Sequence, residues 1–182
     1  MTIMHNNKTA KNAKKASFVF DNVLDLAGYV KQQLNNPTPI KIQKALYFLW
    51  AFYAVTYGNI DYDSQNPSEF NLQVEKYPKA LFAPDFMAKR YGPVIKQVLL
   101  ACKNKQLETL SLKDLQSKIV LGKLAKNEVI LFINNLLVQI NSVNDFGLVQ
   151  RTHQDKAWKT AYAGNQQMSP EMIKADYFKC LV

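Results

Sequence analysis

The feature that most constrains the fold is an apolar run within the stretch IKIQKALYFLWAFYAV, residues 40–55. Every residue from Ala45 to Val55 is apolar. A helix that crosses a bilayer needs roughly 20 consecutive apolar residues, about twice the length of this run. Lys41 and Asp61 lie close to its two ends. A short helix that is apolar on all sides is typical of a buried core. We therefore expect residues 40–55 to form the central helix of a domain and not a membrane span.

The rest of the sequence favours a cytoplasmic protein with one main core. The chain has 182 residues, of which 48% are hydrophobic, and this is about the size of one domain. Its first residues include lysines but no apolar segment of the kind that a secretory signal peptide needs. The two cysteines, Cys102 and Cys180, have no metal-ligand spacing. We expect them to be buried or half-buried thiols.

Positive charge is unevenly distributed along the chain. The formal net charge is +9, and four of these charges lie in the first sixteen residues, at Lys8, Lys11, Lys14 and Lys15. We expect residues 1–17 to be a basic, disordered tail and residues 18–182 to be the folded domain. Such a tail can add salt-sensitive phosphate contacts to a nucleic-acid binder. A tail that only increases solubility is the simpler interpretation, and we favour it.

Apolar residues at helical spacing, together with capping residues, predict several helices. The segment 18–34 has an apolar stripe that is typical of an amphipathic helix. Thr38 and Pro39 are the expected N-cap and first residue of the central helix, and Gly58 is expected to end it. The polar connection at 60–78 is long enough for a functional loop or a short hairpin around residues 70–74.

The remaining part of the chain is also expected to be helical. A short helix should follow Asp85 and end at Gly92, because Gly-Pro is a strong break signal, and Pro93 should begin a new helix. Asn127 is the expected N-cap of a second core helix over 128–140.

A short extended piece is expected at 147–149. Ser169 and Pro170 are expected to begin the last helix. The predicted fold class is mainly α, a single globular helical domain around a central apolar helix, with a small β-hairpin as an option.

Residues with catalytic potential are few. His153 and Asp155 resemble a general-base pair, but no nucleophile elbow is present and His5, the other histidine, is in the tail. The tripeptide at 145–147 spells the kinase magnesium motif without the other kinase motifs. Six glycines offer little for a phosphate-binding loop. The sequence therefore predicts no enzymatic activity, no metal and no cofactor.

Nucleic-acid binding is an alternative function. Lysines and aromatic residues are interleaved in KYPKALF and MAKRYGPVIK, and a helix-turn-helix would fit among short helices. Lysines on outer helix faces are usually solvated, however, and aromatic residues at helical spacing usually belong to the core. Solvated surface lysines and core aromatic residues are therefore the simpler interpretation of these two segments.

Four segments in a fixed order resemble the Panacea domain, the family of SocA-like antitoxins and phage-associated proteins. The first block matches at Lys41, Gln43, Lys44, Leu46, Tyr47 and Phe48. The second matches at Phe86, Ala88, Tyr91, Gly92, Pro93 and Val94. The third matches at Thr152, His153 and Trp158, with Ala157 in place of the family's proline. The last matches at Tyr177 and Phe178. The similarity spans about residues 18–180.

The resemblance implies an antitoxin, often encoded in prophages, that is not an enzyme and neutralises a cognate toxin protein by direct contact. A variant of this function is an adaptor that delivers the toxin to an ATP-dependent protease. Members of the family pair with many unrelated toxins, so the resemblance does not identify the toxin. The alternatives are a phage-associated DNA-binding regulator and an enzyme that uses His153.

Tyr91, His153 and Trp158 either line a shared groove that binds the partner, because exposed aromatic and polar loop residues often form hot spots, or have a structural role. Thr152 is a further partner-binding candidate, and the connection at 60–78 is the other expected contact region.

The remaining matched residues are expected to be structural. Gly92 should adopt a left-handed conformation, which glycine tolerates freely. Lys41 and Lys44 should lie at the surface or pair with Asp21 or Asp25.

Overall fold

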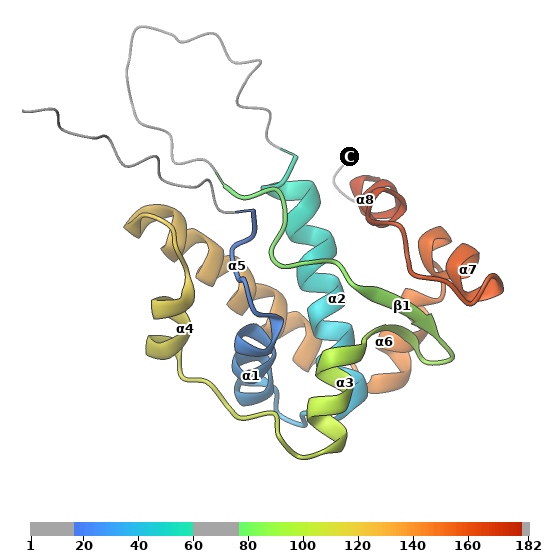
Figure 1. The fold of residues 1–182 in the computed structure, drawn as a ribbon, viewed down its shortest axis with the longest axis horizontal. Coiled ribbons are helices and arrows are strands. Elements are labelled where there is room, and N and C mark those ends of the chain that lie inside the picture. Colours follow the sequence, from blue (N-terminus) through green and yellow to red (C-terminus); the bar gives the residue numbers. More distant parts are fainter. Residues whose placement is uncertain (1–16, 60–76, 180–182) are drawn as a thin grey trace, which may run out of the picture.

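The apolar run lies in α2 (Pro39–Thr56), which passes through the centre of the domain (Figure 1). The hydroxyl oxygen of Thr38 accepts a hydrogen bond from the backbone N–H of Lys41 at 3.0 Å, and Pro39 occupies the first turn. Every side chain from Lys41 to Ala51 is buried. The predicted central helix and its N-cap are therefore confirmed.

The structure is a computed structural model that describes residues 17–59 and 77–179. In these ranges it contains eight helices and one two-stranded antiparallel hairpin, and the predicted mainly helical fold is confirmed. None of the helices in these ranges combines the length and the hydropathy that a bilayer crossing needs. The basic tail, the expected hairpin at 70–74 and Cys180 lie outside the described residues.

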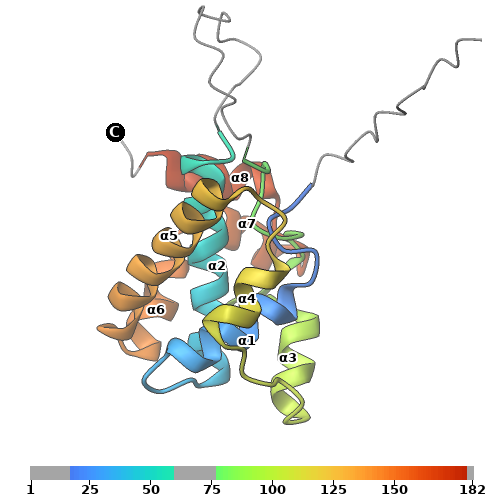
Figure 2. The ribbon, with the colours of Figure 1, turned by 90° about the vertical axis from the view of Figure 1, so that its left-hand side faces the viewer.

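The other helices surround α2 and form two groups that follow one another along the chain (Figures 1 and 2). The first group consists of α1 (Val23–Gln33), α3 (Lys96–Lys103), α4 (Leu112–Lys118) and α5 (Lys123–Asn141). The second consists of α6 (Asp145–Thr152), α7 (Lys156–Ala163) and α8 (Pro170–Phe178). The core therefore surrounds α2, and this arrangement explains why a helix without a polar face is stable here.

The hairpin consists of β1 (Phe86–Lys89) and β2 (Gly92–Ile95), with Arg90 and Tyr91 at its turn. It replaces the helix that was predicted after Asp85, so that prediction was wrong. The helix predicted from Pro93 is present as α3, but it begins only at Lys96, so the predicted start was wrong. Gly-Pro does break the chain here, but the break is a β-turn, because contacts with α2 hold the following residues in an extended conformation.

Several other boundaries differ from the predictions. Residues 18–20 are not helical, because the N–H groups of Val19 and Phe20 donate to the carbonyl oxygens of Ala80 and Leu81. The helix α1 starts after them, and Asn22 is its N-cap. A local apolar stripe cannot distinguish a helix from an extended segment that is paired with a distant part of the chain.

Two predictions in the last third were also wrong, and one is confirmed. The helix α5 begins at Lys123 with Gly122 as its N-cap, so Asn127 lies inside the helix. Residues 147–149, predicted to be extended, belong to α6. The last helix is as predicted, because the hydroxyl oxygen of Ser169 accepts from the backbone N–H of Met172 at 3.2 Å.

Candidate functional site

Two polar side chains of α2 hold the hairpin in place. The side-chain amide of Gln43 donates to the carbonyl oxygen of Ile95 at 3.1 Å, and its oxygen accepts from the Ile95 N–H at 2.8 Å. The ammonium group of Lys44 donates to the carbonyl oxygen of Pro93 at 2.7 Å. These bonds satisfy backbone groups of β2 that a two-stranded hairpin leaves without a strand partner. The hairpin is thereby anchored to the most buried helix of the domain.

The burial of the α2 lysines contradicts the prediction that they are exposed or paired with Asp21 or Asp25. Only 1% of Lys44 is exposed. Lys41 is also buried, and its ammonium group donates to the carbonyl oxygen of Asn141 at 3.4 Å. Their aliphatic stems join the core while backbone carbonyl groups accept from the ammonium groups.

Burial lowers the pKa of Lys44 to about 7 from its ordinary value of 10.5, because the charged form loses its hydration. The backbone of Gly92 packs directly against the Lys44 side chain. A Cβ atom at that position would lie 2.8 Å from Lys44 Cε and 2.5 Å from the hydroxyl oxygen of Thr152. Gly92 also has a φ of +89°, so its predicted left-handed conformation is confirmed. The chain therefore needs glycine here for both space and backbone conformation.

A second buried polar cluster is centred on Asp155, just before α7. One carboxylate oxygen accepts from the hydroxyl groups of Tyr47 at 2.8 Å and Tyr177 at 3.0 Å, and the other accepts from Arg151 at 2.6 Å. Burial, and then the negative charge of Asp155, raise the pKa of both phenols. The cluster ties α2 to the α6–α7 connection and to α8. Its carboxylate is thus engaged by two phenols and a guanidinium group, and this arrangement is that of a structural anchor.

Three stacked rings support the hairpin turn. The imidazole of His153 lies on the indole of Trp158, with ring centroids 3.8 Å apart and planes inclined by 18°. Trp158 in turn stacks on Tyr162 with centroids 4.7 Å apart. The indole N–H of Trp158 donates to the carbonyl oxygen of Lys89 at 3.1 Å. The stack therefore packs directly beneath the end of β1.

His153 contacts the turn itself, at Arg90. Its imidazole forms a hydrogen bond with the backbone of Arg90, while Nε2 is buried and has no hydrogen-bond partner among the described residues. Burial lowers the pKa of His153, and the positive charge of Lys44 acts in the same direction, while the Arg90 contact opposes them. Neutral imidazole is therefore favoured, and its ring serves as a support for the turn.

The structure places the four predicted contact residues at different depths. Thr152 is fully buried, and its hydroxyl donates to the carbonyl oxygen of Val149 at 2.8 Å. His153 is half-buried, and Trp158 is buried. Tyr91 is exposed at the tip of the turn, next to the guanidinium group of Arg90. The first three residues thus support the turn, and Tyr91 is presented by it.

The exposed side chains around this tip form a small surface that is both aromatic and basic. We call it the turn surface, and it consists of Lys89, Arg90, Tyr91, Tyr162 and Asn165. The ammonium group of Lys89 lies 3.4 Å from the side-chain oxygen of Asn165 and so connects the turn to the end of α7. Tyr162 was not predicted as a contact residue, although it follows Trp158 by four residues and so shares its helix face.

Other residues offer little for catalysis or metal binding. Within residues 17–59 and 77–179, no three His, Cys, Asp or Glu side chains are grouped as metal ligands would be. Cys102 is half-buried as predicted, and burial raises the pKa of its thiol, which makes it a weak nucleophile at neutral pH.

No family model, no curated protein and no solved structure matches this chain.

Proposed function

We propose that this protein is an antitoxin that neutralises a toxin by binding it directly through the turn surface. One observation carries the proposal. Polar side chains from three of the segments that resemble the Panacea domain hold the fourth segment, which is the hairpin, and the helices beneath it. Gln43 and Lys44 hold β2, Tyr47 and Tyr177 hold the α6–α7 connection, and Trp158 holds β1.

A rigid support of this kind suits a binding surface. A side chain whose backbone is fixed loses less conformational freedom when a partner binds, so more of its contact energy contributes to affinity. Tyrosine and arginine are among the residues that most often dominate binding energy. Arg90 and Tyr91 are exposed together at the tip. The positive charges of Lys89 and Arg90 favour an acidic surface on the toxin.

The same contacts disfavour an enzyme based on His153. The imidazole is stacked on Trp158 and bonded to the turn, and its remaining nitrogen is buried. Lys44 would be a better nucleophile because its pKa is about 7. It lies beneath Gly92, however, and is almost completely buried. A substrate would have to displace the hairpin to reach either group.

The test is rescue of bacterial growth. The small open reading frame next to this gene would be expressed alone and together with this protein, and we expect arrest in the first case and rescue in the second. Tyr91→Ala should weaken rescue without a change in melting temperature. Phe178→Ala is a matched control, because 49% of Phe178 is exposed, compared with 51% of Tyr91. It should leave rescue unchanged.

Four results would contradict or modify the proposal. Failure of the unmodified protein to rescue growth would remove its main support. Loss of rescue only in variants that also unfold would return Tyr91 to a structural role. A sequence-dependent, salt-sensitive gel shift without rescue would favour the DNA-binding regulator. Rescue that requires an ATP-dependent protease of the host would identify the adaptor variant.

A further inference from the structure

The outer face of α5 is unusually apolar for a surface. Five large hydrophobic side chains of the described residues are at least 60% exposed, and no other exceeds 51%. All five lie on α5 or within five residues of its ends, at Val120, Leu124, Leu131, Val138 and Phe146. Their concentration on one element is unlike the single exposed hydrophobic residues that are normal on a protein surface.

Three of these residues form a stripe along the helix. Leu124, Leu131 and Val138 are seven residues apart, which is two helical turns, so they lie on one face. Leu131 is therefore exposed, although it belongs to the helix that was predicted to be a core helix. The core face of α5 is formed instead by other apolar residues, including Ile130 and Ile133.

Beyond Glu128 the same helix lacks the charges of an ordinary solvent-facing helix. Residues 129–144 contain no Lys, Arg, Asp or Glu, although 20% of the whole chain is charged. Interface cores are depleted in Lys, Glu and Asp compared with the rest of a protein surface. An exposed face that is apolar and uncharged over this length therefore has the composition of a contact surface.

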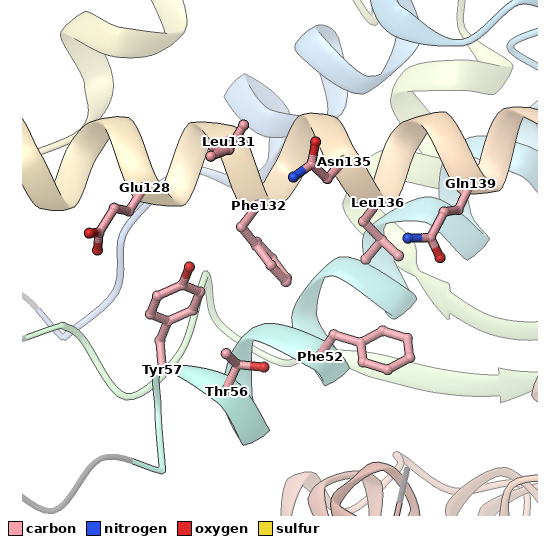
Figure 3. A pocket seen from close by; sticks show the side chains of 9 residues that line it. All are labelled: Phe52, Thr56, Tyr57, Glu128, Leu131, Phe132, Asn135, Leu136 and Gln139. Carbon is pink, nitrogen blue, oxygen red and sulfur yellow. The ribbon is translucent and has the colours of Figure 1, made fainter. Parts of the chain in front are cut away.

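A groove of about 620 Å³ borders the stripe, between α5 and the second half of α2 (Figure 3). Phe132 and Leu136 point from α5 toward Phe52, Thr56 and Tyr57 of α2. The stripe residue Leu131 lies at the outer rim of this groove, with Glu128 and Asn135 one turn away on either side. An element that covered the stripe would therefore also cover this rim.

We propose that the outer face of α5 packs antiparallel against α5 of a second copy of this chain, with Leu131 at the two-fold axis. A second copy fits this face because the stripe is self-complementary. Leu124 and Val138 are each seven residues from Leu131. A two-fold axis at Leu131 therefore brings Leu124 of one copy against Val138 of the other, and Leu131 against itself.

The polar residues beside the stripe fit the same register. In this arrangement Asn135 of one copy lies next to Glu128 of the other, so an amide donor meets a carboxylate acceptor on each side of the axis. The two helix macrodipoles also run in opposite directions, which is the favourable orientation. The absence of charge in residues 129–144 removes like-charge repulsion from the seam.

The expected association is weak. A helix of 19 residues is roughly 28 Å long, so a seam of one helix from each copy buries less than the roughly 1,600 Å² of a standard interface. Each copy also carries a formal charge of +9, and two copies repel one another. We therefore expect a dissociation constant in the micromolar range and tighter association at higher salt, because salt screens the repulsion.

Sedimentation velocity of the full chain over a range of micromolar concentrations tests the interface. The unmodified protein should change from monomer to dimer as its concentration rises. Leu131→Asp should remain monomeric, because it places two carboxylates next to each other at the axis. The control is Leu100→Asp, a change of the same kind at an exposed leucine of α3, and it should still dimerise. A monomer at every concentration, or a dimer that Leu131→Asp leaves unchanged, would refute the proposal.

Disulfide cross-linking tests the register. In a background of Cys102→Ser and Cys180→Ser, Leu131→Cys should give a disulfide-linked dimer under mild oxidation, because residue 131 meets itself. Leu124→Cys alone should not cross-link, whereas a mixture of Leu124→Cys and Val138→Cys chains should. Efficient dimers of Leu124→Cys alone would indicate a parallel arrangement and would overturn the proposal. A monomeric protein in which Leu131→Asp abolishes toxin binding would assign this face to the toxin instead.

Discussion

Lys44 should make the stability of this protein increase with pH in the neutral to mildly alkaline range. Its ammonium group is buried in the folded chain, where its pKa is about 7, and hydrated in the unfolded chain, where its ordinary pKa is 10.5. Between these two values the unfolded chain binds more protons at this lysine than the folded chain does. The free energy of unfolding therefore rises with pH in this window.

The size of the effect follows from the two pKa values. Each pH unit within the window contributes up to about 1.4 kcal/mol. Near pH 7 the folded lysine is itself half protonated, so the slope is smaller there, and the increase from about pH 7 to about pH 9 amounts to about 2 kcal/mol. Above about pH 10 the free energy of unfolding is expected to fall with pH, because of two buried tyrosines. Unfolded tyrosines then lose protons that Tyr47 and Tyr177, whose pKa values are raised, still hold in the folded chain.

Urea unfolding at several pH values from neutral to mildly alkaline measures this change. Lys44→Met keeps an unbranched side chain of similar length and removes the ammonium group, so most of the pH dependence should disappear. Lys96→Met removes one positive charge from the exposed start of α3, and this variant should retain the pH dependence of the wild type. The difference between wild type and Lys44→Met cancels the contributions of all other titrating groups.

Two outcomes would refute this reasoning. A free energy of unfolding that is flat over this pH range would mean that Lys44 remains charged in the folded protein. An equal increase in wild type and in Lys44→Met would mean that another group causes it. In either case the close packing of Lys44 beneath the hairpin would need to be reconsidered.

Three further changes test other parts of the structure by urea unfolding. Gly92→Ala should cost about 1–3 kcal/mol for the φ of +89° alone, and more because the new methyl group meets side-chain atoms of α2 and α6; an unchanged stability would contradict the tight turn. Asp155→Ala should cost about 3 kcal/mol or more, because it leaves the hydroxyl groups of Tyr47 and Tyr177 buried without their acceptor, and Asp155→Asn should cost less. Ser169→Ala should cost about 1 kcal/mol through loss of the N-cap of α8, and Ser169→Thr should restore most of it.

The hairpin and α5 lie on different sides of α2 (Figure 1). A dimer through α5 would therefore leave the turn surface of each copy exposed, and the two proposals can be tested separately. Leu131→Asp should change the oligomeric state and keep rescue of growth. Tyr91→Ala should weaken rescue and keep the oligomeric state.

Sequence reasoning succeeded where a local signal was strong and where no distant segment competed with it. The run from Ala45 to Val55 can only be stable when it is surrounded, so the central position of α2 followed from its composition. Thr38 and Ser169 each precede a proline, and both are N-caps in the structure. A cap bonds to residues two or three positions away, so the sequence contains its whole environment.

Sequence reasoning failed where the outcome depended on which segments meet. Pro93 is well suited to begin a helix, but Gln43 and Lys44 bind the backbone of β2 and keep it extended. Leu131 is as apolar as its neighbours, and only the position of α2 decides which face of α5 is covered. The composition of α5 therefore predicted that the helix is buried, but it could not predict which face of the helix is buried.

By itself, then, the sequence determined a mainly helical domain around one apolar helix, together with the caps that begin α2 and α8. Only the tertiary structure decided that the α2 lysines are buried, that Asp155 anchors two tyrosines, and that Arg90 and Tyr91 are presented at the tip of a hairpin. The physical reason is that helix formation and capping depend on neighbours within about one turn. Hydrogen bonds to buried polar groups depend instead on partners that lie far away in the chain, and those partners are set by the packing of the whole domain.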